Sequence, residues 1–346
     1  MSTLRITVAG AGLIGRRHIE LIHESEACAL CAIVDPAPAA REFALTCGAP
    51  LYATLDALFA HERPDGVIVA TPNRLHVPNG LDCVRHRVPA LIEKPIADSV
   101  EEAMELVDAA EKAGVPLLVG HHRRYSAFMA RTRELLDLGI LGKLVAVQGS
   151  ALFHKPDRYF EEGPWRREAG GGPIMINMIH EVDDLRALCG EIASVQAIAS
   201  NATRGFAVED TVAIVLRFVN GALGTFLLSD TAAATQSWEQ TSGENASYAR
   251  AADQDCYLIA GTRGSIGVPT MRLRTYPGER SWWQPFETET VDVESADPLA
   301  RQLDHFGAVI RGEVPPRVTG FDALQTLKVT LAIAVAATTG KLIYPG

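Results

Sequence analysis

The sequence has no excess of basic residues, few cysteines and no long apolar segment, and each of these absences excludes a class of function. Its 346 residues carry a formal net charge of −10. Because nucleic acids and anionic membranes are bound through a positive field, we expect neither as a partner. Beyond the first strand, the longest apolar run covers residues 329–337, far fewer than the roughly 20 residues that span a bilayer, and we expect a buried helix there.

The first residues lack both the charged segment and the separate apolar segment of a secretion signal, so we expect a cytoplasmic protein. The six cysteines are scattered, and only Cys28 and Cys31 have the spacing of a metal or redox site. No second pair accompanies them, and on a strand they would face opposite sides. We therefore expect reduced thiols and no bound metal.

A glycine pattern, G-x-G-x-x-G, directly follows a short β-branched run at residues 6–9. Gly10 permits a tight turn, Gly12 lets backbone N–H groups approach a phosphate, and Gly15 allows the following helix to pack closely on the strand. Leu13 and Ile14 begin the apolar pattern of that helix. Strand, turn and helix N-terminus together predict a dinucleotide site.

Asp35 lies 20 residues beyond Gly15, after a second apolar run. A carboxylate at this distance accepts hydrogen bonds from the adenosine ribose of a dinucleotide. It would repel the 2′-phosphate of NADP, so Asp35 favours NAD, with NADP the weaker alternative.

The length exceeds the roughly 250–300 residues at which one core stops growing, so we expect two domains. Strands and helices alternate over residues 1–121, which predicts an α/β Rossmann domain with a doubly wound parallel sheet. Residues 122–346 contain consecutive strand-like runs, with a strong hairpin turn at Asn220-Gly221. We predict a second α/β domain there, with a large, mostly antiparallel open sheet that binds helices on one face and another subunit on the other.

Two loops of the first domain should carry site residues, because ligands collect at the carboxyl ends of parallel strands. Thr71-Pro72-Asn73 and His76 follow the strand at residues 67–70, although a plain Pro-Asn turn gives the same pattern. Glu93-Lys94-Pro95 follows the strand at residues 90–92. Lys94 could exchange the proton of a substrate hydroxyl, or it could be the ion-pair partner of a nearby acid.

A helical block at residues 174–188 carries the second catalytic candidate, His180. Asn177, Asp183 and Asp184 recur at helical spacing around it, so a carboxylate could orient the imidazole. Alternatively, His180 has a structural role and only forms hydrogen bonds within a buried row of polar residues. Residues 234–254 lack periodicity and predict a lid or binding loop. We predict that the substrate contacts include Arg124, Asn177, Trp238 and Glu239.

These motifs, in this order, resemble the glucose-fructose oxidoreductase and inositol dehydrogenase (Gfo/Idh/MocA) family. The matching pieces include Arg123-Arg124-Tyr125, Trp165-Arg166, and Gly170-Gly171-Gly172 followed by His180 and Asp183. The resemblance implies hydride transfer between NAD and a hydroxyl-bearing carbon of a sugar, sugar derivative or cyclitol, with Lys94 and His180 handling the proton. It also implies a homodimer or homotetramer and cofactor contacts from Gly10, Gly12, Leu13, Ile14, Asp35, Thr71, Pro72, Asn73, His76, Glu93, Lys94, Trp165 and Arg166.

One position departs from the family pattern. Many members have an aspartate four residues before the histidine, where this chain has Ile176, with Asn177 beside it. An isoleucine accepts no proton, so the carboxylate contribution is either missing or replaced by Asn177.

Two alternative functions stay open. Five arginines, at 123, 124, 158, 166 and 167, could bind a carboxylated substrate such as a sugar acid or a dihydrodiol acid. The chain could also be a non-catalytic NAD-binding sensor or partner subunit.

Overall fold

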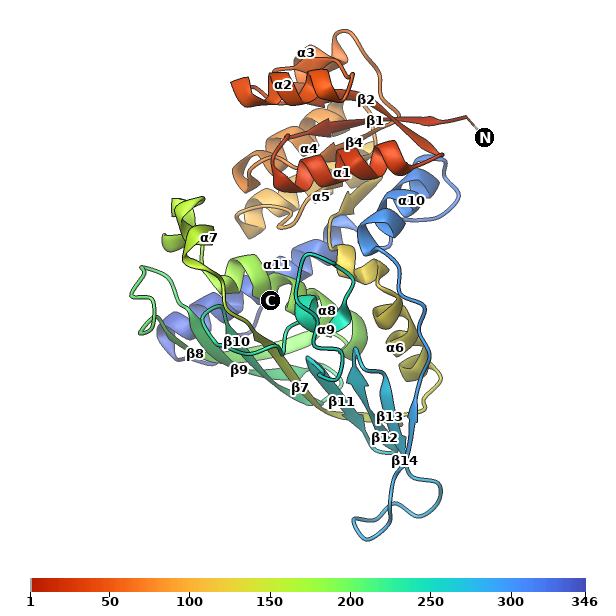
Figure 1. Cartoon of the computed structure of the whole chain (residues 1–346), viewed down its shortest axis with the longest axis vertical. Helices are drawn as coiled ribbons and strands as arrows, with labels where there is room; N and C mark the ends of the chain where they lie inside the picture. The colour runs from red at the N-terminus through yellow and green to blue at the C-terminus, as the bar shows by residue number, and fades with distance from the viewer. Residues whose placement is uncertain (1) are drawn as a thin grey trace. The chain divides into compact units, whose positions relative to one another are not determined.

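The computed structural model describes residues 2–346 and divides into two compact units (Figure 1). Unit 1 comprises the chain up to Tyr125 together with Pro298–Leu327, and unit 2 comprises Ser126–Asp297 and Lys328–Gly346. The sequence predicted a single boundary at residue 121 and did not foresee the return of 298–327. These residues return because α10 (Pro298–Ile310) places Leu303, Phe306 and Val309 in the core of unit 1, beside Ile19 and Ile22.

Unit 1 is built on a six-stranded parallel sheet in the order β3-β2-β1-β4-β5-β6, which confirms the predicted Rossmann fold. The central strands are short apolar runs buried on both faces, as parallel strands covered by helices must be. The strands are β1 (Leu4–Ala9), β2 (Cys28–Val34), β3 (Leu51–Tyr52), β4 (Gly66–Val69), β5 (Ala90–Ile92) and β6 (Leu117–Val119).

Capping residues mark both ends of α5 (Val100–Ala113) in unit 1. Before α5, the Ser99 side chain accepts a hydrogen bond from the Glu102 backbone N–H, and the helix ends at Gly114 in the left-handed conformation. Besides α10, the helices are α1 (Leu13–Glu24), α2 (Pro38–Thr46), α3 (Leu55–Phe59), α4 (His76–Arg85) and α5 (Val100–Ala113), with short 3₁₀ turns η1 (Asn73–Leu75) and η2 (His122–Tyr125).

Unit 2 is built on an eight-stranded sheet in the order β14-β13-β12-β11-β7-β10-β9-β8. Only β7 and β10 pair in parallel, and the Asn220-Gly221 turn joins β9 to β10 as predicted. The sequence did not predict β12, β13 or β14. The strands are β7 (Leu144–Leu152), β8 (Ile192–Ser200), β9 (Thr211–Phe218), β10 (Leu223–Ser229), β11 (Tyr257–Gly261), β12 (Gly264–Val268), β13 (Arg272–Thr275) and β14 (Glu287–Thr290).

One face of this sheet packs against helices, and its alternating inward residues join them in one core. Unit 2 contains α6 (Ala127–Asp137), α7 (Asp157–Glu161), α8 (Ile179–Cys189), α9 (Trp238–Ser242) and the part of α11 (Gly320–Thr339) from Lys328 onward, with a 3₁₀ turn η3 (Pro164–Arg167) and a π-helical turn η4 (Ile174–Met178). The predicted regular helix over 174–188 is therefore a π turn followed by α8. The opposite face of the sheet exposes Ile198, Val215, Leu227 and Leu258.

The helix α11 contains the apolar run at 329–337 and is apolar and long enough to cross a membrane by composition alone. However, Val329, Ala332, Ile333 and Ala336 are buried in the core of unit 2. A packed core helix meets the same composition test, and this one is partly enclosed by the protein. The prediction of a buried helix is confirmed.

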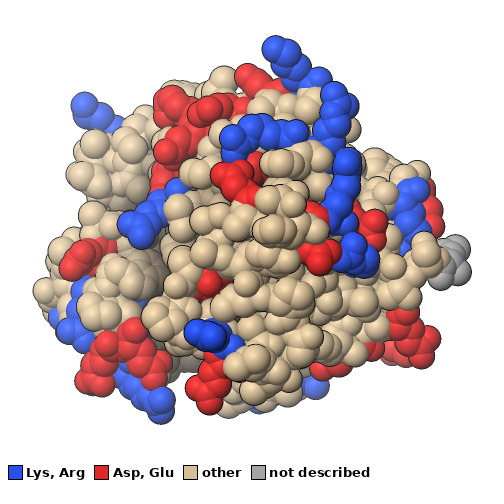
Figure 2. Space-filling model, turned by 90° about the horizontal axis from the view of Figure 1, so that it is seen from above, with Lys and Arg blue, Asp and Glu red and all other residues tan. Residues whose placement is uncertain are grey.

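The face shown in Figure 2 carries charges of both signs, and the cysteines are not paired in disulfides. Figure 2 shows acidic and basic side chains interspersed with uncharged ones over the face it views. All six cysteines are free thiols. Burial raises the pKa of the Cys83 thiol, and likewise that of Cys189, to about 12, so neither thiol ionises near neutral pH.

Candidate functional site

The glycine turn between β1 and α1 has the shape that a pyrophosphate needs. A Cβ at Gly15 would lie 1.9 Å from the carbonyl oxygen of Gly10, and a Cβ at Gly10 would lie 2.4 Å from that of Ala70. These two glycines are therefore required by close backbone packing. A Cβ at Gly12 would meet no atom of residues 2–346 within 4 Å, so this side of the turn is open at the N-terminus of α1. The open side and the helix dipole fit a phosphate group.

Asp35 follows β2 and is tied to the same turn. Its Oδ2 accepts the backbone N–H of Ala11 at 2.8 Å, and its Oδ1 accepts that of Ala37 at 2.8 Å. Each carboxylate oxygen keeps a further lone pair, so the half-buried group can still accept a ribose hydroxyl. Asp35 thus holds the glycine turn in place as well as offering the acceptor that the sequence predicted.

His76 joins the two predicted loops of unit 1. The side chain is buried at the start of α4, its Nε2 hydrogen-bonds the carbonyl of Thr71 at 2.8 Å, and its Nδ1 hydrogen-bonds that of Pro95 at 2.7 Å. Both ring nitrogens are therefore used within the chain. Thr71 also accepts the Asn79 amide, whereas Pro72 and Asn73 are exposed at the carboxyl end of β4.

A buried carboxylate–imidazole pair, formed by Glu93 and His18, lies next to Lys94. Glu93 is 6% exposed and His18, on α1, is 1% exposed, and the imidazole Nε2 lies 2.7 Å from the Glu93 Oε1. The other carboxylate oxygen accepts the Lys94 backbone N–H at 3.3 Å. A Cβ at Gly120, beyond β6, would lie 2.9 Å from this carboxylate. The carboxylate is thus enclosed between α1 and the end of β6, with the half-buried Lys94 next to it.

The electrostatics of Glu93 follow from this packing. Burial raises the pKa of the carboxyl group, but the hydrogen bond with His18 and the charges of His18, His122 and Lys94 together leave the pKa lower than its ordinary value. The group is therefore held as a carboxylate. No sequence motif singled out His18, because its partner is 75 residues away.

In unit 2, Glu209 positions the helix that carries His180. Its Oε1 accepts the backbone N–H of Ile174 at 2.9 Å, at the start of η4. A Cβ at Gly172 would lie 2.4 Å from that carboxylate oxygen, so a glycine is required there. Burial raises the pKa of Glu209, against the effect of its backbone hydrogen bonds. The π turn of η4 then places Asn177 just before α8, and π turns are frequent at functional sites.

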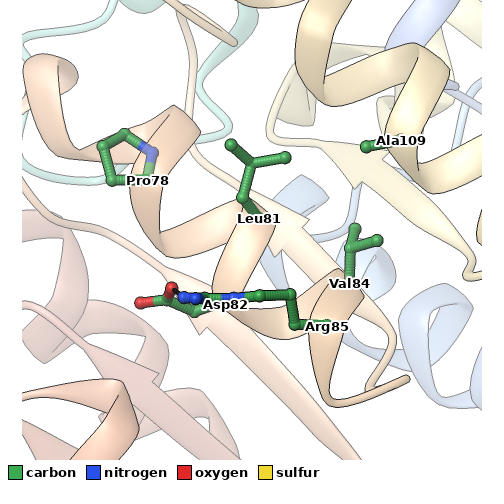
Figure 3. Close-up of a pocket in the computed structure, with 6 residues that line it drawn as sticks. All are labelled: Pro78, Leu81, Asp82, Val84, Arg85 and Ala109. Carbon is green, nitrogen blue, oxygen red and sulfur yellow. Dashed lines mark hydrogen bonds and ion pairs between the residues drawn. The ribbon is translucent and has the colours of Figure 1, made fainter.

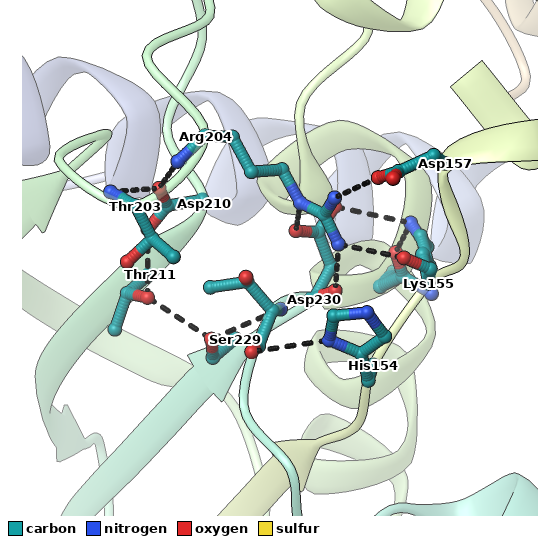
Figure 4. A network of polar contacts seen from close by, with 11 residues as sticks. His154, Lys155, Asp157, Thr203, Arg204, Asp210, Thr211, Ser229 and Asp230 are labelled. Atoms are coloured by element: carbon teal, nitrogen blue, oxygen red, sulfur yellow. Dashed lines mark hydrogen bonds and ion pairs between the residues drawn. The ribbon is translucent and has the colours of Figure 1, made fainter. Parts of the chain in front are cut away.

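Asn177 contacts a network of polar side chains at the ends of β7 and β10, in which Figure 4 labels Lys155, Arg204 and Asp230. Its Oδ1 accepts a hydrogen bond from the Lys155 ammonium at 2.6 Å. Lys155 also lies 3.7 Å from the carboxylate of Asp230, which in turn accepts the Arg204 guanidinium at 3.0 Å. The sequence singled out neither Lys155 nor Arg204.

His180 is 8% exposed and lies in the first turn of α8, within a helix whose acidic residues are also buried. Asp184, predicted as its possible orienting partner, accepts a hydrogen bond from the Tyr257 hydroxyl at 3.1 Å. Tyr257 also donates to Glu181. The stretch thus contains a buried polar network as well as His180, as the pattern of polar residues in an apolar helix indicated.

The remaining candidates differ in exposure. Trp238 is 3% exposed, packs on Tyr257 and donates to Glu244 at 3.0 Å, so it is a core residue. Its neighbour Glu239 is half-buried in α9, which interrupts the loop predicted over 234–254. In unit 1, Arg124 pairs with Asp322 at 3.0 Å. Trp165 is exposed, and the Arg166 guanidinium lies 3.8 Å from the centre of the Tyr159 ring.

Two surface hollows differ in their relation to the candidate residues. One hollow, lined by Pro78, Leu81, Asp82, Val84, Arg85 and Ala109, lies between α4 and α5 and contains none of the candidate residues (Figure 3). A second begins at Asp35 and continues along α2. Over residues 2–346, no group of three histidine, cysteine, aspartate or glutamate side chains is arranged to hold a metal ion.

Comparisons with known proteins extend over both units. Residues 4–121 match the sequence model of the GFO_IDH_MocA oxidoreductase family with its NAD-binding Rossmann fold, and residues 129–267 match that of the GFO/IDH/MocA C-terminal domain. The rhizopine catabolism protein MocA of Rhizobium meliloti is 28% identical over 98% of this chain and 95% of its own length. The 1,5-anhydro-D-fructose reductase of Ensifer adhaerens is 31% identical over 80% of this chain and 78% of its own length.

The fold is also that of solved structures. An oxidoreductase from Agrobacterium radiobacter, crystallised with NAD⁺, L-tartaric acid and magnesium, superposes with a TM-score of 0.82 at 21% identity, covering 100% of this chain and 99% of the other. The predicted family, fold and cofactor are thereby confirmed. The chain belongs to the Gfo/Idh/MocA family of NAD(P)-dependent oxidoreductases.

Proposed function

We propose that this oxidoreductase transfers a hydride between NAD and a hydroxyl-bearing carbon of a sugar, sugar derivative or cyclitol. The observation that carries the proposal is the arrangement at the carboxyl edge of the parallel sheet. There β1, β4 and β5 are neighbours, so the glycine turn, Thr71 and Lys94 follow adjacent strands. Ligands of doubly wound sheets bind at this edge.

The chain's own residues divide into those that hold NAD and those that move a proton. The open side of the turn at Gly12, the N-terminus of α1 and the Asp35 carboxylate would hold the dinucleotide, with Thr71, Pro72 and Asn73 beside it. Trp165 and Arg166 are proposed as further contacts. When bound, the nicotinamide supplies the acceptor or donor of the hydride. Asp35 favours NAD because its charge repels a 2′-phosphate.

Lys94 is proposed to take the hydroxyl proton of the substrate during oxidation and to return it during reduction. The Lys94 backbone N–H donates to the carboxylate of Glu93, so the lysine side chain extends from a fixed backbone position. His180 is proposed to assist this proton transfer. A positioned acid–base group typically contributes a factor of about 10²–10⁴ to the rate.

A carboxylated substrate is the second candidate, and the arginines that suggested it are engaged in the chain. Arg124 pairs with Asp322 and Arg158 pairs with Glu162, while Arg167 lies over the Phe206 ring. Guanidinium groups already paired with carboxylates bind another carboxylate less favourably, so the neutral substrate is preferred.

A second copy of the chain is proposed as the partner that covers the exposed sheet face containing Ile198, Val215 and Leu227.

The test compares NADH formation on matched neutral and acidic compounds. D-glucose and myo-inositol are compared with D-glucuronate, and 1,5-anhydro-D-fructose is offered with NADH for the reverse direction. Turnover on the neutral compounds supports the proposal, and a preference for the carboxylate selects the second candidate. Tight NAD binding with no turnover on a broad panel of alcohols and ketoses would instead identify a non-catalytic NAD-binding protein.

A further inference from the structure

The hydrogen bond between Lys155 and Asn177 determines which end of the amide is used inside the chain. The donor is the Lys155 ammonium, and it lies 2.6 Å from one terminal atom of the Asn177 side chain. An ammonium has three donors and no acceptor, so the atom it contacts must be the amide oxygen. The NH₂ group therefore points away from Lys155. Within residues 2–346 it donates no hydrogen bond, and the side chain is half-buried.

Lys155 is itself held, so the amide cannot turn over easily. Its ammonium lies 3.7 Å from the Asp230 carboxylate and 4.9 Å from the centre of the Tyr159 ring. Asp230 is fixed in turn by Arg204, which also donates to the carbonyl of Lys155 at 2.8 Å. Turning the amide by 180° would place its NH₂ group against the ammonium, which exchanges a charge-assisted hydrogen bond for a repulsive contact.

Asn177 lies in the π turn η4, three residues before His180 in the first turn of α8, so the two residues are within about one helical turn of each other along the chain. We infer that Asn177 is a specificity-determining hydrogen-bond donor toward an acceptor oxygen of the substrate, and that Lys155 is the positioning residue that sets its direction. The inference rests on the proposed function. It also bears on the question raised by Ile176: Lys155 already uses one of the two lone pairs of the Asn177 oxygen, whereas both N–H donors of the amide are available.

The substitution Asn177→Asp separates the two roles. An aspartate at 177 would pair with Lys155 and present lone pairs where the asparagine presents N–H groups. We expect kcat/KM on the best compound of the panel above to fall on the order of 10-fold or more, mainly through KM, and we expect the same of Asn177→Ala. If Asn177 acted as a substitute for the aspartate, Asn177→Asp would keep or increase kcat/KM, and that result would overturn the inference.

Lys155 is tested by a double-mutant cycle. Lys155→Met should lower kcat/KM in the wild-type background and cause no further loss in the Asn177→Ala background, since its effect passes through the amide. Lys155→Arg, which also only donates, should restore most of the activity. Additive losses, or no rescue by arginine in a variant that melts like the wild type, would contradict the positioning role.

A measurement without turnover keeps the inference separate from the proposed function. The chain has six asparagines, so a sample labelled with ¹⁵N-asparagine gives six side-chain NH₂ pairs, and Asn177→Asp identifies the pair of residue 177. Lys155→Met should shift that pair and leave the pairs of Asn73 and Asn79 in place. If the NH₂ signals of Asn177 do not move in Lys155→Met, the positioning role of Lys155 is refuted, even if the protein turns over no compound. If the signals move as expected but the wild type is inactive, only the proposed function is refuted.

Discussion

Removing His18 should destabilise unit 1 more than any exposed substitution on the same helix. His18 and Glu93 form a buried pair 2.7 Å apart, and the substitution His18→Ala would leave the Glu93 carboxylate enclosed without its partner. Breaking a buried pair by removing one member costs about 3–5 kcal/mol. Because Glu93 also accepts the Lys94 backbone N–H, the loss should loosen the backbone at Lys94 and reduce turnover as well.

The pH dependence of this effect has a definite sign. The pKa of Glu93 is lower in the folded protein than its ordinary value, so the carboxylate contributes stability above the unfolded pKa, and this stability is lost as the pH falls through the folded pKa. The difference in unfolding free energy between wild type and His18→Ala should therefore be largest near neutral pH. It should shrink in acid, where Glu93 is protonated in both proteins.

The assay must report on unit 1. All four tryptophans lie in unit 2, at positions 165, 238, 282 and 283, so fluorescence follows unit 2 alone. Hydrogen exchange of the backbone amides in β1 and β5, measured with increasing urea, gives the free energy of opening in unit 1. His23→Ala is the matched control, because His23 is exposed on the same helix. An equal opening free energy in His18→Ala and His23→Ala at neutral pH would refute the reasoning.

Three further predictions follow from other parts of the structure. Asp35→Ser should weaken NAD binding by on the order of 10-fold and reduce the preference for NAD over NADP, measured by cofactor titration, because it removes the carboxylate beside the ribose and the support of the Ala11 N–H; an unchanged preference would remove Asp35 from cofactor selection. Val215→Glu, in the exposed face of the sheet, should shift the protein to a smaller species in light scattering, while Val314→Glu, exposed in unit 1, should not; identical masses would exclude this face as the interface. Cys83 and Cys189, whose pKa is about 12, should stay unmodified by iodoacetamide at neutral pH in the native protein and react in urea, as read by mass spectrometry; rapid native labelling of either would contradict their burial.

Local signals predicted much of unit 1 and part of unit 2. The glycine turn and the hairpin at Asn220-Gly221 depend on residues close together in the sequence, and each was predicted correctly. The sequence did not predict β13 and β14 because neither strand alternates apolar and polar residues. Arg272–Thr275 is largely polar, and Glu287–Thr290 is exposed throughout. Pairing with neighbouring strands holds them in the sheet, and a single segment does not reveal such pairing.

Long-range contacts account for the rest of what the sequence did not predict. The His18–Glu93 pair spans 75 residues, and the Lys155–Asn177 bond joins the end of β7 to the π turn before α8. Trp238 was interpreted as a substrate contact because it lies in an aperiodic stretch, but Tyr257 and Glu244 hold it in the core. The candidates Lys94 and His180 came from motifs, whereas the groups that position them, His18 and Glu209, became visible only in the structure.

The most direct test of the proposed chemistry is the steady-state turnover of Lys94→Ala with NAD and the best substrate of the panel, alongside the binding constant for NAD. Lys112→Ala, a substitution of an exposed lysine on α5, is the control. The account predicts that Lys94→Ala lowers kcat on the order of 10²-fold or more while NAD binds nearly as tightly as before. A kcat equal to that of the wild type and of Lys112→Ala would contradict it and remove Lys94 from the mechanism.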